Sequence, residues 1–284
     1  VSLAARRAVN PKAMEAYLRG MDHRSRTTVE SAGQAIEYFE RAVAIDSTFA
    51  EAYAALAFAY IVYAWVGIMP AEEAVPKAKL NIDRALALDP NLPEAIGALA
   101  DYKYSYEADS AAAEQLFQRT FALDPNLAAF HNSYAFFLAI EGDCGKAVSE
   151  AKLAHMLDPL NAAYAGGIGI IFLDCFMSDS ALVYLTRAIA EDSAEAYSRL
   201  YRSSVYATGG RYREALRDVE IAVAVNENHK ALLAAWYVNT GDTARAKRVF
   251  GEVVSLAPRG YWSPTTLAAA SYWLGKGVRL ESAL

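Results

Sequence analysis

Residues 82–90 read IDRALALDP, and closely similar segments recur along the chain. They are FERAVAIDS at 39–47, FQRTFALDP at 117–125, AKLAHMLDP at 151–159, LTRAIAEDS at 185–193 and FGEVVSLAP at 250–258, with VEIAVAVN at 219–226 in the same register. The successive steps are 43, 35, 34, 34, 34 and 31 residues. A period of this length is typical of a repeat architecture in which each unit is a helix pair.

Small residues mark one face of the second helix in every repeat. In the first repeat the row is Ala35, Phe39 and Ala42, with spacings of four and three residues. Residues at such spacings lie on one helix face, and small side chains let a neighbouring helix approach closely. We therefore interpret this face as a packing surface. The later rows begin at Ala78, Ala113, Ala147, Ala181, Ala215 and Ala246.

A first helix precedes each of these rows, as in Tyr53-x-x-Leu56-Ala57-x-x-Tyr60 and His131-x-x-Tyr134-Ala135-x-x-Leu138. Glycine supplies a turn between the two helices, and proline ends the second helix because it lacks an amide hydrogen. The turn glycines are Gly142, Gly210 and Gly241, and the stop prolines are Pro90, Pro125, Pro159 and Pro258.

In these features the chain resembles the tetratricopeptide repeat (TPR) family. The resemblance implies an all-α, right-handed α-solenoid of antiparallel helix pairs that share one continuous core, because no single pair could bury its apolar faces alone. We expect a single superhelical domain over residues 1–284. Its expected repeats are 11–47, 48–90, 91–125, 126–159, 160–193, 194–227 and 228–258, followed by a partial capping unit at 259–284.

A narrower resemblance concerns the C-terminal repeat region of bacterial winged-helix transcriptional regulators and adenylate-cyclase-type signalling proteins. Its motifs are Asn10-Pro11-x-Ala13-x-x-Ala16-Tyr17-Leu18-x-Gly20, the insertion Gly67-x-x-Pro70-x-Glu72-Glu73-Ala74-x-Pro76, and Tyr261-x-Ser263-Pro264. In such proteins the DNA-binding or cyclase domain lies outside the repeats. The chain begins at Val1 rather than Met, and we expect it to be a fragment of a longer polypeptide.

Composition argues against several functions. The formal net charge is −6, whereas a nucleic-acid-binding surface needs clustered Lys and Arg. Cys144 and Cys175 lack metal-ligand spacing; one bridge between them is conceivable, but we expect free, inert thiols because their turns belong to different repeats. The uncharged stretch 52–71 is long enough for a membrane span, yet it is rich in Ala and Tyr and carries a repeat motif, so we expect no span. We expect no signal peptide either, because Arg6 and Arg7 are followed by residues 8–10 and Pro11 rather than by an apolar core.

No catalytic or metal site is expected. The histidines, His23, His131, His155 and His229, fall at unlike positions of different repeats, and we interpret His131 as a packing residue. The run Gly166-Gly167-Ile168-Gly169 lacks the strand and the Lys/Ser/Thr register of a phosphate loop. It falls in a first helix, where close helix packing explains it better. The sequence therefore predicts no enzyme, cofactor or metal.

The implied concave groove would be lined by the first helix of each pair. Apolar and aromatic groups flanked by acidic residues there favour a neutral-to-basic, partly apolar protein segment, and no Lys or Arg is expected among them. The alternative is that several of these side chains merely pack between neighbouring helices. The predicted binding residues are Glu51, Phe58, Val62, Asp101, Tyr104, Asn132, Phe136, Ile170, Asp174, Tyr197 and Ser204.

The leading hypothesis is a non-catalytic protein-interaction scaffold, the regulatory or sensory module of a bacterial transcription or signalling protein. The alternatives are a stand-alone adaptor in secretion or envelope assembly and an accessory domain of an enzyme such as a glycosyltransferase. We expect a cytoplasmic location, with the periplasm as the alternative if the parent protein is membrane-anchored. Homo-oligomer formation is left open, as is the identity of the partner.

Overall fold

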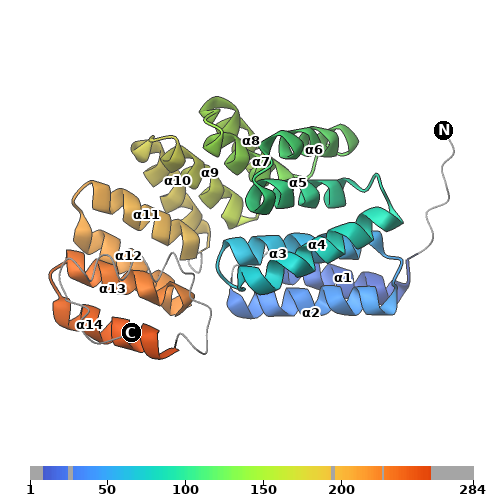
Figure 1. Ribbon diagram of the computed structural model, residues 1–284. Helices are drawn as coiled ribbons and strands as arrows, with labels where there is room; N and C mark the ends of the chain where they lie inside the picture. Colours follow the sequence, from blue (N-terminus) through green and yellow to red (C-terminus); the bar gives the residue numbers. More distant parts are fainter. Residues whose placement is uncertain (1–8, 25–27, 193–195, 226, 257–284) are drawn as a thin grey trace. The chain divides into compact units, whose positions relative to one another are not determined.

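The computed structural model describes residues 9–24, 28–192, 196–225 and 227–256, and no strand occurs within these ranges. The helices follow one another in antiparallel pairs (Figure 1). The pairs are α1 (Pro11–Arg24) with α2 (Val29–Ile45), α3 (Ala50–Trp65) with α4 (Ala71–Leu88), α5 (Pro93–Glu107) with α6 (Ser110–Leu123), α7 (Ala128–Ile140) with α8 (Cys144–Leu157), α9 (Ala162–Asp174) with α10 (Ser178–Glu191), α11 (Ala196–Thr208) with α12 (Tyr212–Val225), and α13 (Lys230–Asn239) with α14 (Thr243–Leu256).

Each pair lies within one of the ranges expected from the repeat spacing, and a short 3₁₀ turn, η1 (Glu227–His229), precedes α13. The expected capping unit at 259–284 lies outside the described residues. The chain divides into two compact units between Phe130 and His131, inside α7, which we call the N-terminal and C-terminal units. The single superhelical domain over the whole chain stays a prediction.

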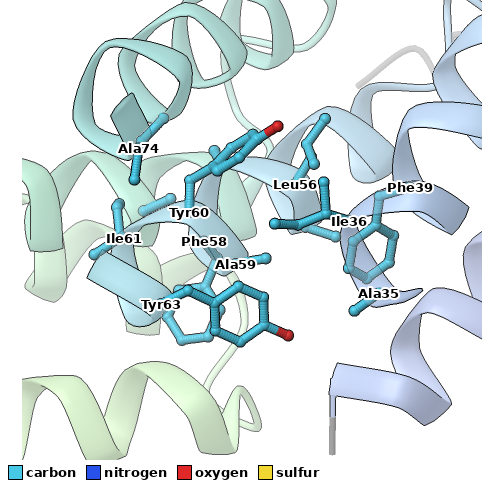
Figure 2. Packing of buried hydrophobic residues seen from close by; sticks show 14 of the residues in the cluster. Ala35, Ile36, Phe39, Leu56, Phe58, Ala59, Tyr60, Ile61, Tyr63 and Ala74 are labelled. Atoms are coloured by element: carbon cyan, nitrogen blue, oxygen red, sulfur yellow. The ribbon is translucent and has the colours of Figure 1, made fainter. Parts of the chain in front are cut away.

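The core of the N-terminal unit is built on α2, α3 and α4. Phe39 is fully buried and Tyr60 nearly so, and Ile36 of α2 lies beside Leu56 of α3 (Figure 2). Almost the whole length of α3 is buried, because this helix is covered on several sides by its neighbours. That enclosure explains why the stretch from Ala52 onward is uncharged. Within the described ranges, none of the helices combines the length and apolar character that crossing a membrane requires.

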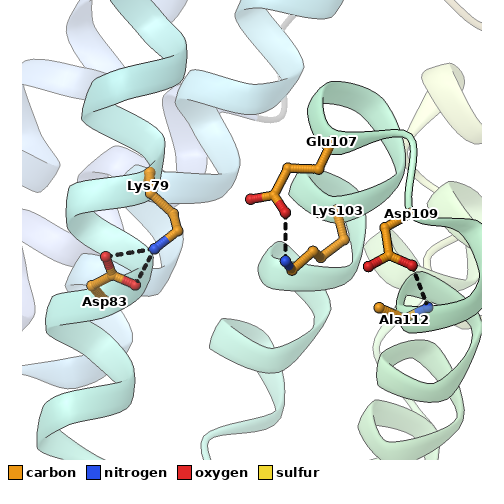
Figure 3. Close-up of polar contacts among 6 residues, drawn as sticks. All are labelled: Lys79, Asp83, Lys103, Glu107, Asp109 and Ala112. Carbon is orange, nitrogen blue, oxygen red and sulfur yellow. Dashed lines mark hydrogen bonds and ion pairs between the residues drawn. The ribbon is translucent and has the colours of Figure 1, made fainter.

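The helix phase predicted from the small residues is confirmed. Ala35, Ala78, Ala147 and Ala181 are all 0% exposed, as are the equivalent alanines of the other repeats. Ion pairs along a helix lie on outward faces, as with Lys79 and Asp83 on α4 and Lys103 and Glu107 on α5 (Figure 3). Small residues on the inward face let neighbouring helices pack closely, and i,i+4 ion pairs stabilise the outward face of each helix.

The turns between paired helices need a left-handed residue, and glycine supplies it in four of the described turns. Gly67, Gly142, Gly210 and Gly241 have φ values of 67°, 88°, 73° and 84°. The same place is taken by Ala108 (φ 53°) before α6 and by Phe176 (φ 59°) before α10. Asp109 follows Ala108 and caps α6, because its carboxylate accepts from the amide of Ala112 at 3.1 Å (Figure 3).

The apolar insertion after α3 folds onto its own repeat. The amides of Ile68 and Met69 both donate to the carbonyl of Tyr63, at 2.8 and 3.0 Å. The side chains of Val66, Ile68 and Met69 pack against the core of the N-terminal unit. Trp65, at the end of α3, remains 51% exposed.

Candidate partner-binding surfaces

The binding residues predicted in the N-terminal unit come from α3 and α5, and they differ in burial. Phe58 and Asp101 are only 9% and 7% exposed, whereas Glu51, Val62 and Tyr104 are half-buried. The Phe58 ring makes an edge contact with Phe130, with ring centroids 5.1 Å apart. The side chains of Phe58 and Asp101 both lie beneath the surface, and their role in partner binding stays a prediction.

Arg24 covers Phe58 from the end of α1, with its guanidinium 5.2 Å from the ring centroid. Such a contact is a favourable cation–π interaction. The expectation that no basic side chain lies among the predicted groove residues is thus corrected. The sequence signal for Arg24 was its place in the last turn of α1, where basic side chains favour the helix C-terminus.

Acidic and aromatic groups from three helices act on one another beside Arg24. Burial raises the pKa of Tyr17, Arg24 lowers it, and Glu94 and Glu51 raise it again. These are the half-buried residues Tyr17 and Arg24 of α1, Glu51 of α3 and Glu94 of α5, which we call the N-terminal patch. This coulombic influence indicates that the three charged groups lie near the Tyr17 hydroxyl group. The patch thus combines carboxylates with an aromatic ring on the first helices of successive pairs.

Tyr63 borders this region as a buried polar group. Burial raises its pKa to about 12, an effect that Arg24 opposes. The side chain is only 4% exposed, and its hydroxyl group finds no hydrogen-bond partner among the described residues.

In the C-terminal unit the predicted binding residues lie on α7, α9 and α11. Ile170 is buried (9% exposed), and its role in partner binding likewise stays a prediction. Asn132, Phe136 and Tyr197 are half-buried, while Asp174 and Ser204 are exposed. Partial desolvation raises the pKa of Asp174, and burial together with Asp174 raises the pKa of Tyr201.

The glycine run on α9 allows close helix packing, as predicted. A Cβ atom at Gly169 would lie 2.7 Å from Cγ of Leu185, and one at Gly167 would lie 2.6 Å from Oδ1 of Asn132. A Cβ atom at Gly166 would clash with the hydroxyl group of Ser198. These positions therefore have room only for hydrogen, and packing between neighbouring helices accounts for the whole run.

Buried histidines in this unit have structural partners. His131 is 5% exposed, and its Nδ1 lies 2.6 Å from Oε2 of Glu150, which supports its predicted packing role. His229 makes an edge contact with the ring of Tyr197, and burial lowers its pKa to about 4. Across the part of the chain that is described, no three His, Cys, Asp or Glu side chains gather as a metal site would require.

The two cysteines form a disulfide, which corrects the expectation of free thiols. Cys144 begins α8 and Cys175 directly follows α9, and their Cα atoms are 5.8 Å apart. Although the two turns belong to different repeats, stacking brings equivalent turns of consecutive repeats side by side. The bridge therefore joins the turn before α8 to the turn before α10.

Comparisons with known proteins agree with this architecture. No model of a known protein family matches the chain. The transcriptional regulator HilA of Salmonella typhimurium is 29% identical over 147 residues, which are 52% of this chain and only 26% of the regulator. A thermophilic TPR protein of Thermus thermophilus superposes with a TM-score of 0.52 at 18% identity, covering 69% of this chain and 99% of that protein. The fold is that of the tetratricopeptide repeat.

Other solved structures share the TPR fold. PilW, a type IV pilus biogenesis factor, has a TM-score of 0.55 at 16% identity and covers 77% of this chain and 98% of its own. A monomeric IFIT1 mutant solved with Gppp-AAAA has a TM-score of 0.74 at 15% identity, with coverage of 93% and 62%. At these identities the likeness concerns the fold alone.

In both units, the predicted binding residues lie on the first helix of a pair. The repeat motif predicted which helix each residue occupies, but it did not predict which of those side chains a neighbouring helix covers. Phe58 and Ile170 are covered in this way. Arg24 and Tyr17 were missed because the motif of the first TPR unit indicates packing and carries no signal for a contact surface.

Proposed function

We propose that this chain is a non-catalytic protein-interaction module of a bacterial transcription or signalling protein, and that it binds a basic, partly apolar segment of another protein. The observation that carries the proposal is the N-terminal patch, where Glu51 and Glu94 lie within electrostatic reach of the Tyr17 ring. Carboxylates beside an aromatic surface suit a segment that carries Lys or Arg next to apolar side chains.

The regulatory role is supported by the likeness to HilA, which covers about half of this chain. That match spans 26% of the regulator. We therefore propose that the parent protein acts in transcription, and that this chain contributes the protein-binding module. The net charge of −6 argues against the nucleic-acid ligand that IFIT1 was solved with.

A second setting, an adaptor in envelope assembly, is favoured by the disulfide. Disulfides persist in oxidising compartments and are rare in the cytosol. The fold shared with the pilus biogenesis factor PilW is compatible with that setting. We accordingly propose the periplasm as the location that fits the Cys144–Cys175 bridge, in place of the cytoplasm.

The binding proposal is tested by selecting peptides from a phage-displayed random library on the purified chain. We expect enrichment of peptides that combine Lys or Arg with aliphatic or aromatic residues. Glu51→Gln with Glu94→Gln should weaken the selected peptides about tenfold, because the isosteric amides remove the charge but keep the shape. The matched control is Glu72→Gln, an exposed residue of α4. Equal affinity of all variants for every selected peptide would contradict the proposal.

A further inference from the structure

The turn between α9 and α10 presents a phenylalanine in a left-handed conformation that most of the other described turns fill with glycine, and one with Ala108. Phe176 has φ 59°, where Gly142, Gly210 and Gly241 stand in equivalent turns. A bulky L-residue rarely adopts this left-handed conformation because its side chain crowds the backbone. The phenyl ring is 95% exposed, so burial within the protein does not compensate for the strain. Strain of this kind is often found at functional positions.

The backbone of this turn is fixed. The amide of Phe176 donates to the carbonyl of Leu173 at 2.9 Å, and the amide of Met177 donates to the carbonyl of Phe172 at 2.8 Å. The residue before Phe176 is Cys175, whose disulfide to Cys144 ties the turn to its neighbour before α8. Phe176 is therefore held on a rigid support, which lowers the entropy cost of binding through it.

Further exposed apolar side chains lie on the same two turns. Met177 is 48% exposed, and Ile140, the last residue of α7, is 63% exposed. We call Ile140, Phe176 and Met177 the turn patch. The Cys144–Cys175 disulfide joins the turns that carry or adjoin these three exposed apolar side chains.

The turns that carry this patch are acidic. Residues 140–146 and 173–180 contain Glu141, Asp143, Asp174 and Asp179 but only one basic residue, Lys146. Lys146 pairs with Asp143 at 2.9 Å. The two turn segments themselves thus carry a net negative charge. A second copy of this chain, itself at a net charge of −6, is electrostatically a poor occupant, whereas a basic segment is favoured.

From these observations we propose that the turn patch is a second docking surface, which binds a protein segment carrying Lys or Arg beside aliphatic or aromatic residues. The inference rests on the proposed function as a protein-binding module, but it assigns the contact to the disulfide-joined turns rather than to the N-terminal patch. Phe176 would supply most of the apolar contact, and the surrounding carboxylates would attract the basic side chains.

The test uses the same phage-displayed peptide library on the oxidised full chain, with a second selection on Phe176→Gly. This variant removes the ring and places glycine in a left-handed conformation that glycine adopts readily, so its fold should be retained. The matched control is Tyr212→Ser, which removes an exposed aromatic ring (44% exposed) close to the next inter-helix turn. We expect a class of basic-apolar peptides that binds Phe176→Gly about tenfold more weakly and Tyr212→Ser within about twofold of the parent.

The two proposals fail in different ways. Peptides that depend on Phe176 but not on Glu51 and Glu94 support the turn patch. Peptides that depend on Glu51 and Glu94, with none weakened by Phe176→Gly, overturn the turn patch and leave the proposed function standing. A selection that yields no peptide weakened by Phe176→Gly overturns this inference, whatever else it enriches.

Discussion

Arg202 holds Asp218 with two hydrogen bonds, both 2.7 Å long, from Nε and Nη2 to the two carboxylate oxygens. The guanidinium of Arg199 lies 3.6 Å from the same carboxylate. Asp218 is 4% exposed, and the hydrogen bond to it raises the pKa of Arg202. One buried carboxylate on α12 therefore balances two arginines of α11, its partner helix in the same repeat.

Asp218→Ala should lower the free energy of unfolding by about 3 kcal/mol, because it leaves buried guanidinium groups without their counter-charge. The measurement is urea unfolding monitored by circular dichroism. The control is Glu214→Ala, which removes the exposed ion pair with Arg211 and should cost less than about 0.5 kcal/mol. Equal losses in the two variants would show that the buried cluster is no stronger than a surface pair.

Reduction of the Cys144–Cys175 disulfide should destabilise the protein by about 3 kcal/mol. The bridge closes a loop with a sequence separation of 31, and opening it restores entropy to the unfolded chain. Thermal unfolding with and without reductant measures the effect, and Cys144→Ser with Cys175→Ser is the control that should no longer respond to reductant. Alkylation of both thiols in the native, unreduced protein would contradict the bridge.

Ala147→Leu and Ala181→Leu should each cost about 1–3 kcal/mol by overpacking, because both alanines are 0% exposed. Ala190→Leu is the matched control, since Ala190 is an exposed residue of α10. Thermal unfolding midpoints distinguish the two kinds of site. Unchanged midpoints for Ala147→Leu and Ala181→Leu would mean that the helix phase is wrong.

His229 should make stability depend on pH. Its pKa falls from the usual 6.5 to about 4 because burial disfavours the charged imidazole. His229 is neutral in the folded protein, so its contribution to the free energy of unfolding is constant above about pH 6.5. As the pH falls from 6.5 towards 4, the unfolded state binds a proton at His229 while the folded state does not, and the free energy of unfolding decreases. Between about pH 7.5 and 5 this loss should be about 2 kcal/mol.

The matched variant for this dependence is His229→Gln, which carries no titrating group. Subtracting its unfolding free energy at each pH from that of the parent removes the contribution of the carboxylates, which titrate mainly below about pH 5. A difference that is constant from about pH 7.5 to 5 would mean that His229 is solvated in the folded protein.

The repeat pattern was sufficient to predict the helix pairs and the inward face of each second helix. Ala147 and Ala181 show why: a small residue at a fixed spacing reports its own helix phase. Contacts between repeats were harder to predict, because they depend on how far each pair rotates relative to the next. The Cys144–Cys175 bridge and the cover that Arg24 gives Phe58 are contacts of this kind, between residues of different repeats.

The left-handed turn residues illustrate the same limit. Gly142, Gly210 and Gly241 were identified as turns because glycine adopts positive φ easily. Ala108 and Phe176 take the equivalent conformation, although neither alanine nor phenylalanine predicts a positive φ from the sequence. The turn was predictable there only from the spacing of its neighbours, and the exposed ring of Phe176 was therefore missed.

The bridge between α8 and α9 also alters how the chain would respond to a pulling force. Repeat arrays usually extend one unit at a time, since each unit contacts only its neighbours. With the sulfurs joined, the segment between them, a separation of 31 residues, cannot lengthen. The segment would extend to roughly 100 Å, at about 3.3–3.6 Å per residue, and this length becomes available only after the disulfide is reduced. Tension applied to the ends would thus bypass the interior of this loop, and the two repeats would yield together.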